Sequence, residues 1–472
     1  MNKYFYITTT LPYINDEPHI GFAMEIIRAD AFARFYRLLG YKVFFSTGTD
    51  EHGLKIYQRA QQLKIPAKIY CDQYAQKFKD LKTLLNLSYD RFIRTTDDDH
   101  IKASQEFWRR CLKNGDIYKG RYRVRYCVGC EMEKSDSELK DNRCLFHPNR
   151  PLEIIEEENY FFRFSRYQKK LLDFYQKNPD FVQPNFRQKE IVEFVQKGLK
   201  DFSISRIKSK MPWGIDVPND PQQVIYVWFD ALINYISTLG WPNNIKNFNH
   251  YWPGIQVAGK DNLRQQAAMW QAMLFSAGLK PSKKIYIEGF INVEGQKMSK
   301  SLGNVISPFD LVKKYGIDAV RYYLLREVPS FDDGNFSYSR MNQLYQSELA
   351  NELGNLLSRL TNLGQKDKLK IDANPQPKLF TKKIIDSLNR FQFNAILEDI
   401  WKEIKNLNKK IDSFAPWNKE EIQRKKFLIQ SLQSLRNIAI QLQPFLPKTA
   451  EKIISACRGQ IKKIPPLFPR LK

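Results

Sequence analysis

The amino-acid sequence predicts an α/β protein that is interrupted by an insertion and ends in an all-α domain. Strand-like and helical segments alternate over residues 1–115, the βαβ pattern of a nucleotide-binding fold. Cysteines, turns and short strand-like runs break this rhythm over residues 116–222. Parallel-sheet character returns over residues 223–290, and long helical patterns dominate from Met341 onward. The α/β domain is therefore expected in two halves, one on either side of the insertion.

The first strand and the first helix are joined by a turn suited to binding an anion. Tyr4–Thr9 reads as a strand, and Phe22–Leu39 has apolar residues at helical spacing with Gly40 in the position of a C-cap glycine. Between them lies Pro18-His19-Ile20-Gly21. A helix N-terminus presents free N–H groups and the positive end of a dipole, and His19 can add a donor. A lone histidine beside a glycine is more often structural, so this motif alone leaves its role open.

The insertion contains the residues of a metal site. Cys127, Cys130, Cys144 and His147 give the spacing C-x2-C-x13-C-x2-H. Three thiolates and one imidazole form a tetrahedral set that suits Zn²⁺, and four protein ligands leave no open position. We therefore expect one structural Zn²⁺, whose binding stabilises the insertion. The remaining cysteines stand singly and are expected to be reduced thiols of a cytosolic protein: Cys71, Cys111 and Cys457.

The second half of the α/β domain leads into a lysine motif. Strand-like runs at 224–228 and 284–287 precede a linker predicted over residues 291–345, which contains Lys297-Met298-Ser299-Lys300-Ser301. Two lysines on a loop form a mobile cationic clamp, suited to a phosphate chain that moves during a reaction. An isolated pair at this spacing is more often a solvated basic loop. The upstream histidine motif favours the phosphate interpretation.

Residues 346–472 are predicted to form an all-α bundle. An apolar stripe at helical spacing consists of Leu349, Leu353, Leu356, Leu357 and Leu360. The net charge of the chain is +24, and residues 351–472 hold 24 Lys/Arg against 11 Asp/Glu. Such an excess attracts a polyanion such as nucleic acid, although a general lysine bias is an alternative explanation.

The composition argues against a membrane protein. The chain has 472 residues, which favours two to four domains, and 43% apolar residues, which is enough for real cores. No apolar run approaches the length of a membrane span. We see no signal or transit peptide, so the expected location is the cytoplasm.

The histidine and lysine motifs together resemble the two signature motifs of class I aminoacyl-tRNA synthetases, and their surroundings resemble the methionyl-tRNA synthetases. The resemblance covers nearly the whole chain and is specific because of the order and spacing of its motifs. Further matching stretches are Leu11-Pro12-Tyr13, Gly48-Thr49-Asp50-Glu51-His52-Gly53, Tyr226-Val227-Trp228-Phe229-Asp230-Ala231, Gly259-Lys260-Asp261, Gly289-Phe290, Leu302-Gly303-Asn304 and Ala415-Pro416-Trp417.

This resemblance implies a class I Rossmann-like catalytic domain with a zinc-bearing insertion, followed by an all-α anticodon-binding bundle. The expected parts are the first catalytic half (1–115), the connective insertion (116–222), the second catalytic half (223–290), the lysine-motif linker (291–345) and the anticodon-binding domain (346–472). The implied enzyme is a methionine–tRNA ligase of the short form. It would use ATP with Mg²⁺ to activate methionine as methionyl-adenylate, and would transfer the acyl group to the 3′ end of tRNA(Met). The chain stops soon after residues 465–469, so we expect a monomer without an appended domain.

The resemblance also assigns residues to roles. His19, Lys297 and Lys300 would be catalytic, and ATP would be held by His19, Gly21, Gly259, Asp261, Lys297, Met298 and Lys300. The amino acid would contact Leu11, Tyr13, Asp50, Trp228, Ala231, Tyr235, Gln266 and Trp270, with Asp50 binding the ammonium group and aromatic walls suiting a thioether. On spacing alone, Tyr235 and Trp270 would be read as core aromatics. The anticodon would be read by Asn355, Arg359 and Trp417, through hydrogen bonds and stacking.

Two positions depart from the family pattern. Phe22 occupies the place of the second histidine of the first motif and cannot donate a hydrogen bond to a phosphate. Asn262, Gln265 and Gln266 stand where the family has an apolar residue, an aromatic residue and a histidine. Buried amides are unfavourable in an apolar pocket unless they are paired. The sequence therefore leaves open two alternatives: a class I ligase with altered amino acid specificity, and an inactive tRNA-binding paralogue.

Overall fold

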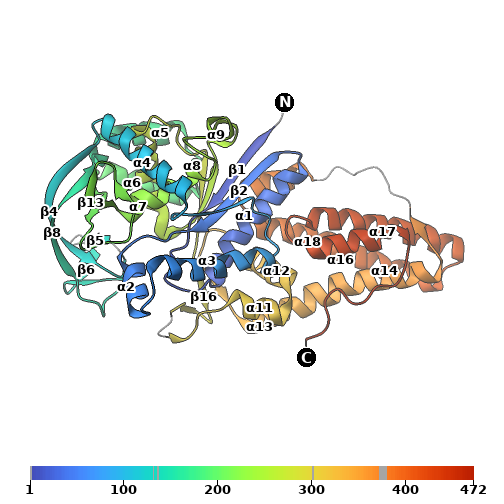
Figure 1. Ribbon diagram of the computed structural model, residues 1–472. Helices are drawn as coiled ribbons and strands as arrows, with labels where there is room; N and C mark the ends of the chain where they lie inside the picture. Colours follow the sequence, from blue (N-terminus) through green and yellow to red (C-terminus); the bar gives the residue numbers. More distant parts are fainter. Residues whose placement is uncertain (1–2, 131, 135–137, 300–301, 372–379, 472) are drawn as a thin grey trace.

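The computed structural model describes residues 3–130, 132–134, 138–299, 302–371 and 380–471. Its centre is a six-stranded parallel sheet in the order β3-β2-β1-β14-β15-β9 (Figure 1). The strands of this sheet are β1 (Tyr4–Thr9), β2 (Lys42–Thr49), β3 (Arg91–Arg94), β9 (Val182–Gln183), β14 (Ile255–Gly259) and β15 (Lys284–Glu288). The predicted parallel α/β fold is therefore confirmed.

The first helix lies where the sequence predicts it. The first strand has the expected bounds, and α1 (Ile20–Leu38) begins two residues earlier than expected because His19 caps its N-terminus. Gly40 has a φ of +82° and its N–H donates to the carbonyl of Arg37, so it ends the helix as predicted. The other helices of this part are α2 (Leu54–Gln62), α3 (Ala67–Leu84), α4 (Asp98–Lys113), α7 (Val227–Leu232), α8 (Asn234–Ser237), α9 (Ile245–Tyr251) and α10 (Trp270–Ser276).

One predicted strand of the parallel sheet is wrong. The apolar run at residues 224–228 belongs instead to β13 (Asp220–Ile225), which pairs antiparallel with β11 (Ser205–Ile207) and β12 (Asp216–Val217) in a separate sheet. The chain then turns into α7, whose first turn is closed by the N–H of Asp230 donating to the carbonyl of Tyr226. A short apolar run fits a buried strand and a buried helix equally well, so its pattern could not separate the two.

The insertion is a β-layer with two helices. Its long hairpin pairs β4 (Ile117–Cys127) with β8 (Glu153–Phe162), and β9 at its far end joins the edge of the central sheet. The remaining elements are β5 (Met132–Lys134), β6 (Leu139–Lys140), β7 (Arg143–Cys144), β10 (Phe202–Ser203), α5 (Gln168–Lys177) and α6 (Asn185–Gln196).

The C-terminal part is helical and extends away from the sheet (Figure 1). A continuous helical run of α13 (Tyr338–Leu344), a π-helical segment (Tyr345–Gly354) and α14 (Asn355–Lys366) crosses the expected boundary between residues 345 and 346. The other elements are β16 (Ile291–Val293), β17 (Gln296–Lys297), α11 (Pro308–Tyr315), α12 (Ile317–Arg326), β18 (Gly334–Phe336), β19 (Lys370–Ile371), α15 (Lys382–Asn389), α16 (Phe393–Phe414), α17 (Glu421–Leu442), α18 (Pro447–Ala456) and β20 (Gly459–Gln460). None of the helices in the described ranges is long and apolar enough to cross a membrane.

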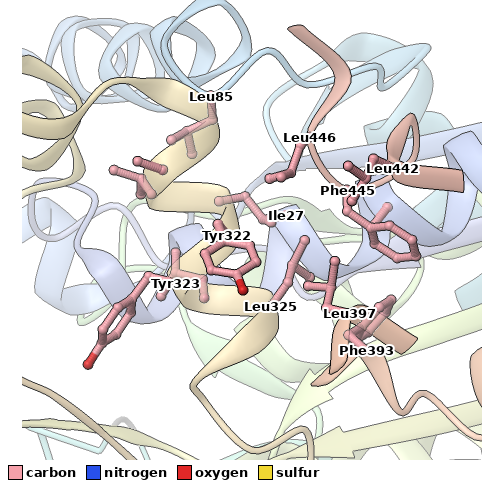
Figure 2. Packing of buried hydrophobic residues seen from close by; sticks show 14 of the residues in the cluster. Ile27, Leu85, Tyr322, Tyr323, Leu325, Phe393, Leu397, Leu442, Phe445 and Leu446 are labelled. Atoms are coloured by element: carbon pink, nitrogen blue, oxygen red, sulfur yellow. The ribbon is translucent and has the colours of Figure 1, made fainter. Parts of the chain in front are cut away.

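A single apolar core joins the α/β part to the helical domain. Figure 2 shows Ile27 of α1 and Tyr322 of α12 packed in one cluster with Leu397 of α16 and Leu442 of α17. The predicted leucine stripe of residues 349–360 is fully buried in the same cluster. The two domains therefore share buried surface rather than meeting through a solvated hinge.

A buried ion pair lies in this core. Arg321 of α12 and Asp30 of α1 are 2.9 Å apart, and both side chains are fully buried. The guanidinium also donates to the carbonyls of Leu85, Pro444 and Phe445. The flanking cations Arg321 and Arg34, together with a hydrogen bond from Ser88, lower the pKa of Asp30 against the effect of its burial. One side chain of α12 thus binds both the α/β part and the helical domain.

We predict that Asp30→Asn lowers the free energy of unfolding by about 3–5 kcal/mol, because it leaves the Arg321 charge buried without its counterion. The measurement is equilibrium urea unfolding. As a matched control, Glu398→Gln removes a carboxylate from an ion pair on α16 that is half exposed, and should change stability by less than about 1 kcal/mol. Equal effects of the two substitutions would contradict the role assigned to the buried pair.

Candidate active site

A cavity of about 620 Å³ opens at the carboxyl ends of β1, β14 and β15, beside the N-terminus of α1. Ligands of open parallel sheets bind at this edge. The cavity brings together most of the site residues expected from the sequence: Leu11, Tyr13, His19, Gly21, Asp50, Trp228, Ala231, Tyr235, Gly259, Asp261, Gln266, Lys297 and Met298. These residues come from segments separated by up to 287 positions, and the fold alone makes them neighbours.

His19 is oriented by the helix that follows it. Its Nδ1 accepts a hydrogen bond of 3.1 Å from the N–H of Gly21 and so caps α1. Desolvation in the cavity lowers the pKa of His19, so the ring is neutral at neutral pH. Since Nδ1 accepts, the ring proton is on Nε2. The histidine therefore offers one N–H donor at the positive end of a helix, which suits an anionic ligand.

Gly21 is required by the close approach of the His19 imidazole. A Cβ atom at this position would lie 2.9 Å from Cε1 of His19 and 3.5 Å from Cε of Met298. A side chain at this position would therefore displace the imidazole, and it would also meet Met298 of the lysine motif.

Lys297 is presented by a hairpin. β16 and β17 are joined by Glu294 and Gly295, both with positive φ, the two-residue turn that suits a tight hairpin. After the hairpin, Asn304 holds the loop by accepting from the N–H of Ser299 and donating to the carbonyl of Lys297. Lys297 lines the cavity, whereas Lys300 lies outside the described residues.

Asp50 is fixed beside Tyr13 by the backbone. The N–H of Asp50 donates to the carbonyl of Pro12, and its carbonyl accepts from the N–H of Ile14. These bonds make a short parallel bridge past the ends of β1 and β2, and Asp50 is 7% exposed within it. Its carboxyl group is therefore largely buried at the cavity wall.

The apolar end of the cavity is formed by α7, α8 and a π-helical segment (Gln265–Met269). Gln266 donates to the hydroxyl of Tyr235, and its Oε1 accepts from Gln256 at 2.9 Å. This amide in the place of the expected histidine is therefore paired at both ends. In contrast, Oε1 of Gln265 is buried without a hydrogen-bond partner in the part of the chain that the structure describes.

Trp270 does not line the cavity. It is fully buried behind Tyr235, with an edge contact of 5.9 Å between ring centroids, and stacks on Phe107. Trp270 therefore supports the cavity wall from behind. This position agrees with the interpretation from spacing alone, in which Trp270 is a core aromatic residue.

Phe22 is part of the cavity wall and packs its ring edge against Phe78, with centroids 5.3 Å apart. No donor stands at this position. The partly buried ring also packs against the apolar core.

The four expected metal ligands lie together in the insertion. The ligand atoms of Cys127, Cys130, Cys144 and His147 are all within 4.8 Å of one another. Sγ of Cys130 is 3.5 Å from Sγ of Cys144 and 3.2 Å from Nδ1 of His147. A tetrahedral zinc with bonds of about 2.0–2.3 Å places its ligand atoms about 3.5–3.8 Å apart, so the donor set fits a metal ion.

The metal cluster borders the cavity. Gly129 and Cys130 are among its lining residues. Phe146, which lies between the last two ligands, has Nζ of Lys297 at 5.8 Å from its ring centroid. The insertion therefore approaches the lysine hairpin at the mouth of the cavity.

Comparison with known proteins identifies the family. A family described as tRNA synthetases class I (M) matches residues 5–144 and 129–361. The chain belongs to the class I methionyl-tRNA synthetases. The methionine–tRNA ligase of Thermotoga maritima is 42% identical over 471 residues, covering 95% of this chain and 74% of the relative. The methionine–tRNA ligase of Rickettsia bellii is 43% identical, and the match covers 96% of this chain and 92% of the relative.

Solved structures agree with this family. The Mycobacterium tuberculosis methionyl-tRNA synthetase in complex with methionyl-adenylate has a TM-score of 0.92 and 37% identity, covering 99% of this chain and 100% of that one. The apo form of that enzyme has a TM-score of 0.86 and 34% identity, and the match covers 100% of this chain and 99% of that one. The class I fold with an inserted cysteine–histidine cluster and a C-terminal helical domain is thus confirmed.

The three residues assigned to anticodon binding by the methionyl-tRNA synthetase resemblance lie together at the far part of the helical domain. Asn355 and Arg359 are one turn apart on α14, and Trp417 lies in a short 3₁₀ turn (Pro416–Asn418) between α16 and α17. The guanidinium of Arg359 lies 5.8 Å from the Trp417 ring centroid and 2.6 Å from Oδ1 of Asp412. The indole is 54% exposed, so one of its faces is available to a ligand.

Sequence reasoning missed two carboxyl groups of the site. Glu25 of α1 and Glu288 of β15 line the cavity and are 8% and 1% exposed. Glu25 is one helical turn beyond Gly21, a spacing that could have pointed to it. Glu288 directly precedes the matching pair Gly289-Phe290.

A buried carboxylate supports the wall from behind. Asp230 of α7 is fully buried and lies 2.7 Å from Nδ1 of His52 and 2.7 Å from Nε2 of His100. These two partners outweigh the desolvation and lower the pKa of Asp230 to about 2. The network fixes α7, which carries Trp228 and Ala231, against α4.

We predict that Asp230→Asn lowers the free energy of unfolding by about 2–3 kcal/mol at neutral pH, because two buried imidazoles lose their ionised acceptor. The folded pKa of about 2 lies below the ordinary value of 3.8, so the stabilisation is complete above about pH 4 and is lost as the pH falls toward 2. Urea unfolding at several pH values should show the difference between the proteins shrinking in that range. The control Asp173→Asn, exposed on α5, should show no such difference, and a pH-independent gap for Asp230→Asn would contradict the prediction.

Proposed function

We propose that this chain activates methionine with ATP and transfers it to tRNA(Met), acting as a monomer. The observation that carries the proposal is the cavity itself. Residues of both signature motifs line it, together with a buried carboxyl group and an apolar end. A paralogue that only binds tRNA would have no use for this arrangement.

The amino acid is bound between Asp50 and the apolar end of the cavity. The Asp50 carboxylate takes the ammonium group, and the thioether lies among Leu11, Tyr13, Trp228, Ala231, Tyr235 and Gln266, with Trp270 behind them. The soft, flexible side chain of methionine suits aromatic walls. Because both ends of the Gln266 amide already have partners, its polarity is compatible with an apolar side chain beside it.

ATP is bound along the other side, with Mg²⁺ accompanying its phosphates. His19 donates from Nε2 to the phosphates beside the first amides of α1, and Gly259 and Asp261 hold the adenosine. The methionine carboxylate attacks the α-phosphate, and pyrophosphate leaves. Lys297 and Lys300 neutralise the charge on the pyrophosphate as it departs. Since Phe22 offers no donor, His19 and the lysines carry a larger share of this stabilisation.

The tRNA is bound by the helical domain, where residues 351–472 carry a net charge of +13. Asn355 and Arg359 hydrogen-bond to anticodon bases, and the exposed indole of Trp417 stacks on an unpaired base. To meet a base, Arg359 exchanges its contact with Asp412 for the RNA. A structural Zn²⁺ held by Cys127, Cys130, Cys144 and His147 fixes the tip of the insertion near the cavity.

The proposed function is tested by ATP–pyrophosphate exchange across a panel of amino acids. We expect exchange with methionine alone, followed by methionylation of tRNA(Met). Exchange with a different amino acid would favour altered specificity, and no exchange with any would favour an inactive paralogue.

In the same assay, Gly21→Ala should reduce kcat/KM for ATP at least about tenfold, because the new Cβ would lie 2.9 Å from Cε1 of His19 and displace the imidazole. The KM for methionine should change little. Gly120→Ala serves as the control, since a Cβ there meets nothing closer than 3.5 Å. Full activity of Gly21→Ala would contradict the placement of ATP.

Zinc is tested by elemental analysis of the purified protein. We expect one zinc per chain, its loss in Cys144→Ser, and its retention in Cys71→Ala, which changes a buried cysteine outside the cluster. Because metal binding stabilises the fold locally, chelation should expose the segment from 127 to 147 to proteases while the central sheet stays protected. A metal-free protein with an equally protected segment would contradict the assignment.

A further inference from the structure

Two buried carboxyl groups lie at the end of the cavity where the proposed function places the nucleoside. Glu288 ends β15 and pairs in register with Gly259 of β14, so the two residues are neighbours at the carboxyl edge of the sheet. Glu25 faces the same space from α1. Asp261 lies at this wall as well. Three ionised carboxylates would repel a polyanionic nucleotide, so the protonation state of this wall matters for binding.

Glu288 has a cationic partner. Nη1 of Arg28 lies 3.4 Å from Oε1 of Glu288, and both side chains are almost completely buried. The guanidinium also donates to the carbonyls of Val328, Pro329 and Ser330. An arginine stays charged when buried, so Arg28 requires a nearby anion, and the Glu288 carboxylate is the one at ion-pair distance in the described ranges.

Glu25 has only neutral donors. The N–H and the hydroxyl of Thr10 both donate to its Oε1, at 2.8 and 2.6 Å. Its other oxygen, Oε2, receives neither of these bonds. Within the described residues no lysine or arginine forms an ion pair with Glu25, in contrast to Glu288.

The charged groups around Glu25 and Glu288 decide which of the two carboxyl groups holds a proton. Burial, together with the neighbouring Glu288 and Asp261, raises the pKa of Glu25 well above its usual range, while the Thr10 bonds oppose this. Burial raises the pKa of Glu288 to about 7 against the influence of Arg28. Tyr235, which also faces Glu25, stays neutral because its own pKa is raised. The two glutamates therefore titrate as a coupled pair, and Arg28 favours the anion on Glu288 and the proton on Glu25.

We propose that Glu25 is held as a neutral acid in this cavity and donates a hydrogen bond from Oε2 to an acceptor atom of the bound nucleoside, with the Arg28–Glu288 ion pair as the positioning element that keeps the proton on Glu25. This inference rests on the proposed function, because it assumes that the nucleoside occupies this end. Its consequence is that nucleoside binding requires one proton on the protein.

The test is isothermal titration of the whole chain with adenosine between about pH 6 and pH 9, a range in which adenosine has no titrating group. Affinity should fall by roughly tenfold per pH unit once the pair deprotonates, and titrations in two buffers of different ionisation enthalpy should show proton uptake on binding. In Glu25→Gln, the amide keeps a neutral donor, so affinity should be retained and become independent of pH. In Glu288→Gln, the unbalanced charge of Arg28 favours ionised Glu25, so the affinity for adenosine should begin to fall at a lower pH.

The matched control is Glu17→Gln, which changes an exposed carboxylate that lines the same cavity. This variant should show the same pH dependence of adenosine affinity as the parent protein. If the parent protein bound adenosine independently of pH and without proton uptake, the inference would be overturned, but the proposed function would stand. An unchanged pH dependence in Glu25→Gln would have the same result. Absence of adenosine binding at every pH would overturn the nucleotide placement of the proposed function, and this inference with it.

Discussion

The arrangement of this protein depends on one buried guanidinium. Arg321 bonds to Asp30 of the helix that carries the first signature motif, to the loop after α3, and to the backbone where the helical domain turns between α17 and α18. Its charge can be accommodated only while all these partners are in place. Both side chains of the pair are fully buried. Burial of the apolar core supplies the stability of the domain junction, and the ion pair fixes how the elements align there.

Helix α1 concentrates much of the chemistry of the site in a few turns. Its cap is His19 and its first turn contains Gly21. Glu25 lines the cavity, Arg28 pairs with Glu288, and Asp30 pairs with Arg321. A shift of the helix along its axis would move His19, Glu25 and the domain ion pair together. Binding geometry and folding stability are therefore coupled through one rigid element.

Much of the fold followed from local patterns. The strand at Tyr4–Thr9, the helix after His19 with its terminal glycine, the metal cluster and the leucine stripe of residues 349–360 each have a periodicity or a spacing that a short window reveals. The run at 224–228 did not, since its apolar residues suit a strand and a helix alike. Pairing of Gln266 with Gln256 and Tyr235 also lay beyond the sequence, because it joins three distant segments in the folded state. The same holds for Glu25 and Glu288, whose importance arises from a desolvated cavity wall that exists only after folding.

The unbroken helix from Tyr338 to Lys366 has a geometric consequence. It begins beside the lysine hairpin, where the N–H of Tyr338 donates to Glu294, and it carries Asn355 and Arg359 farther along. With a rise near 1.5 Å per residue, the helix separates its hairpin end from Asn355 by roughly 25 Å. A continuous helix resists stretching, so the chain contains a rod of set length between the lysine hairpin and the proposed anticodon-binding residues Asn355 and Arg359. Any ligand that contacts both the lysine hairpin and this part of the helix must therefore match that length.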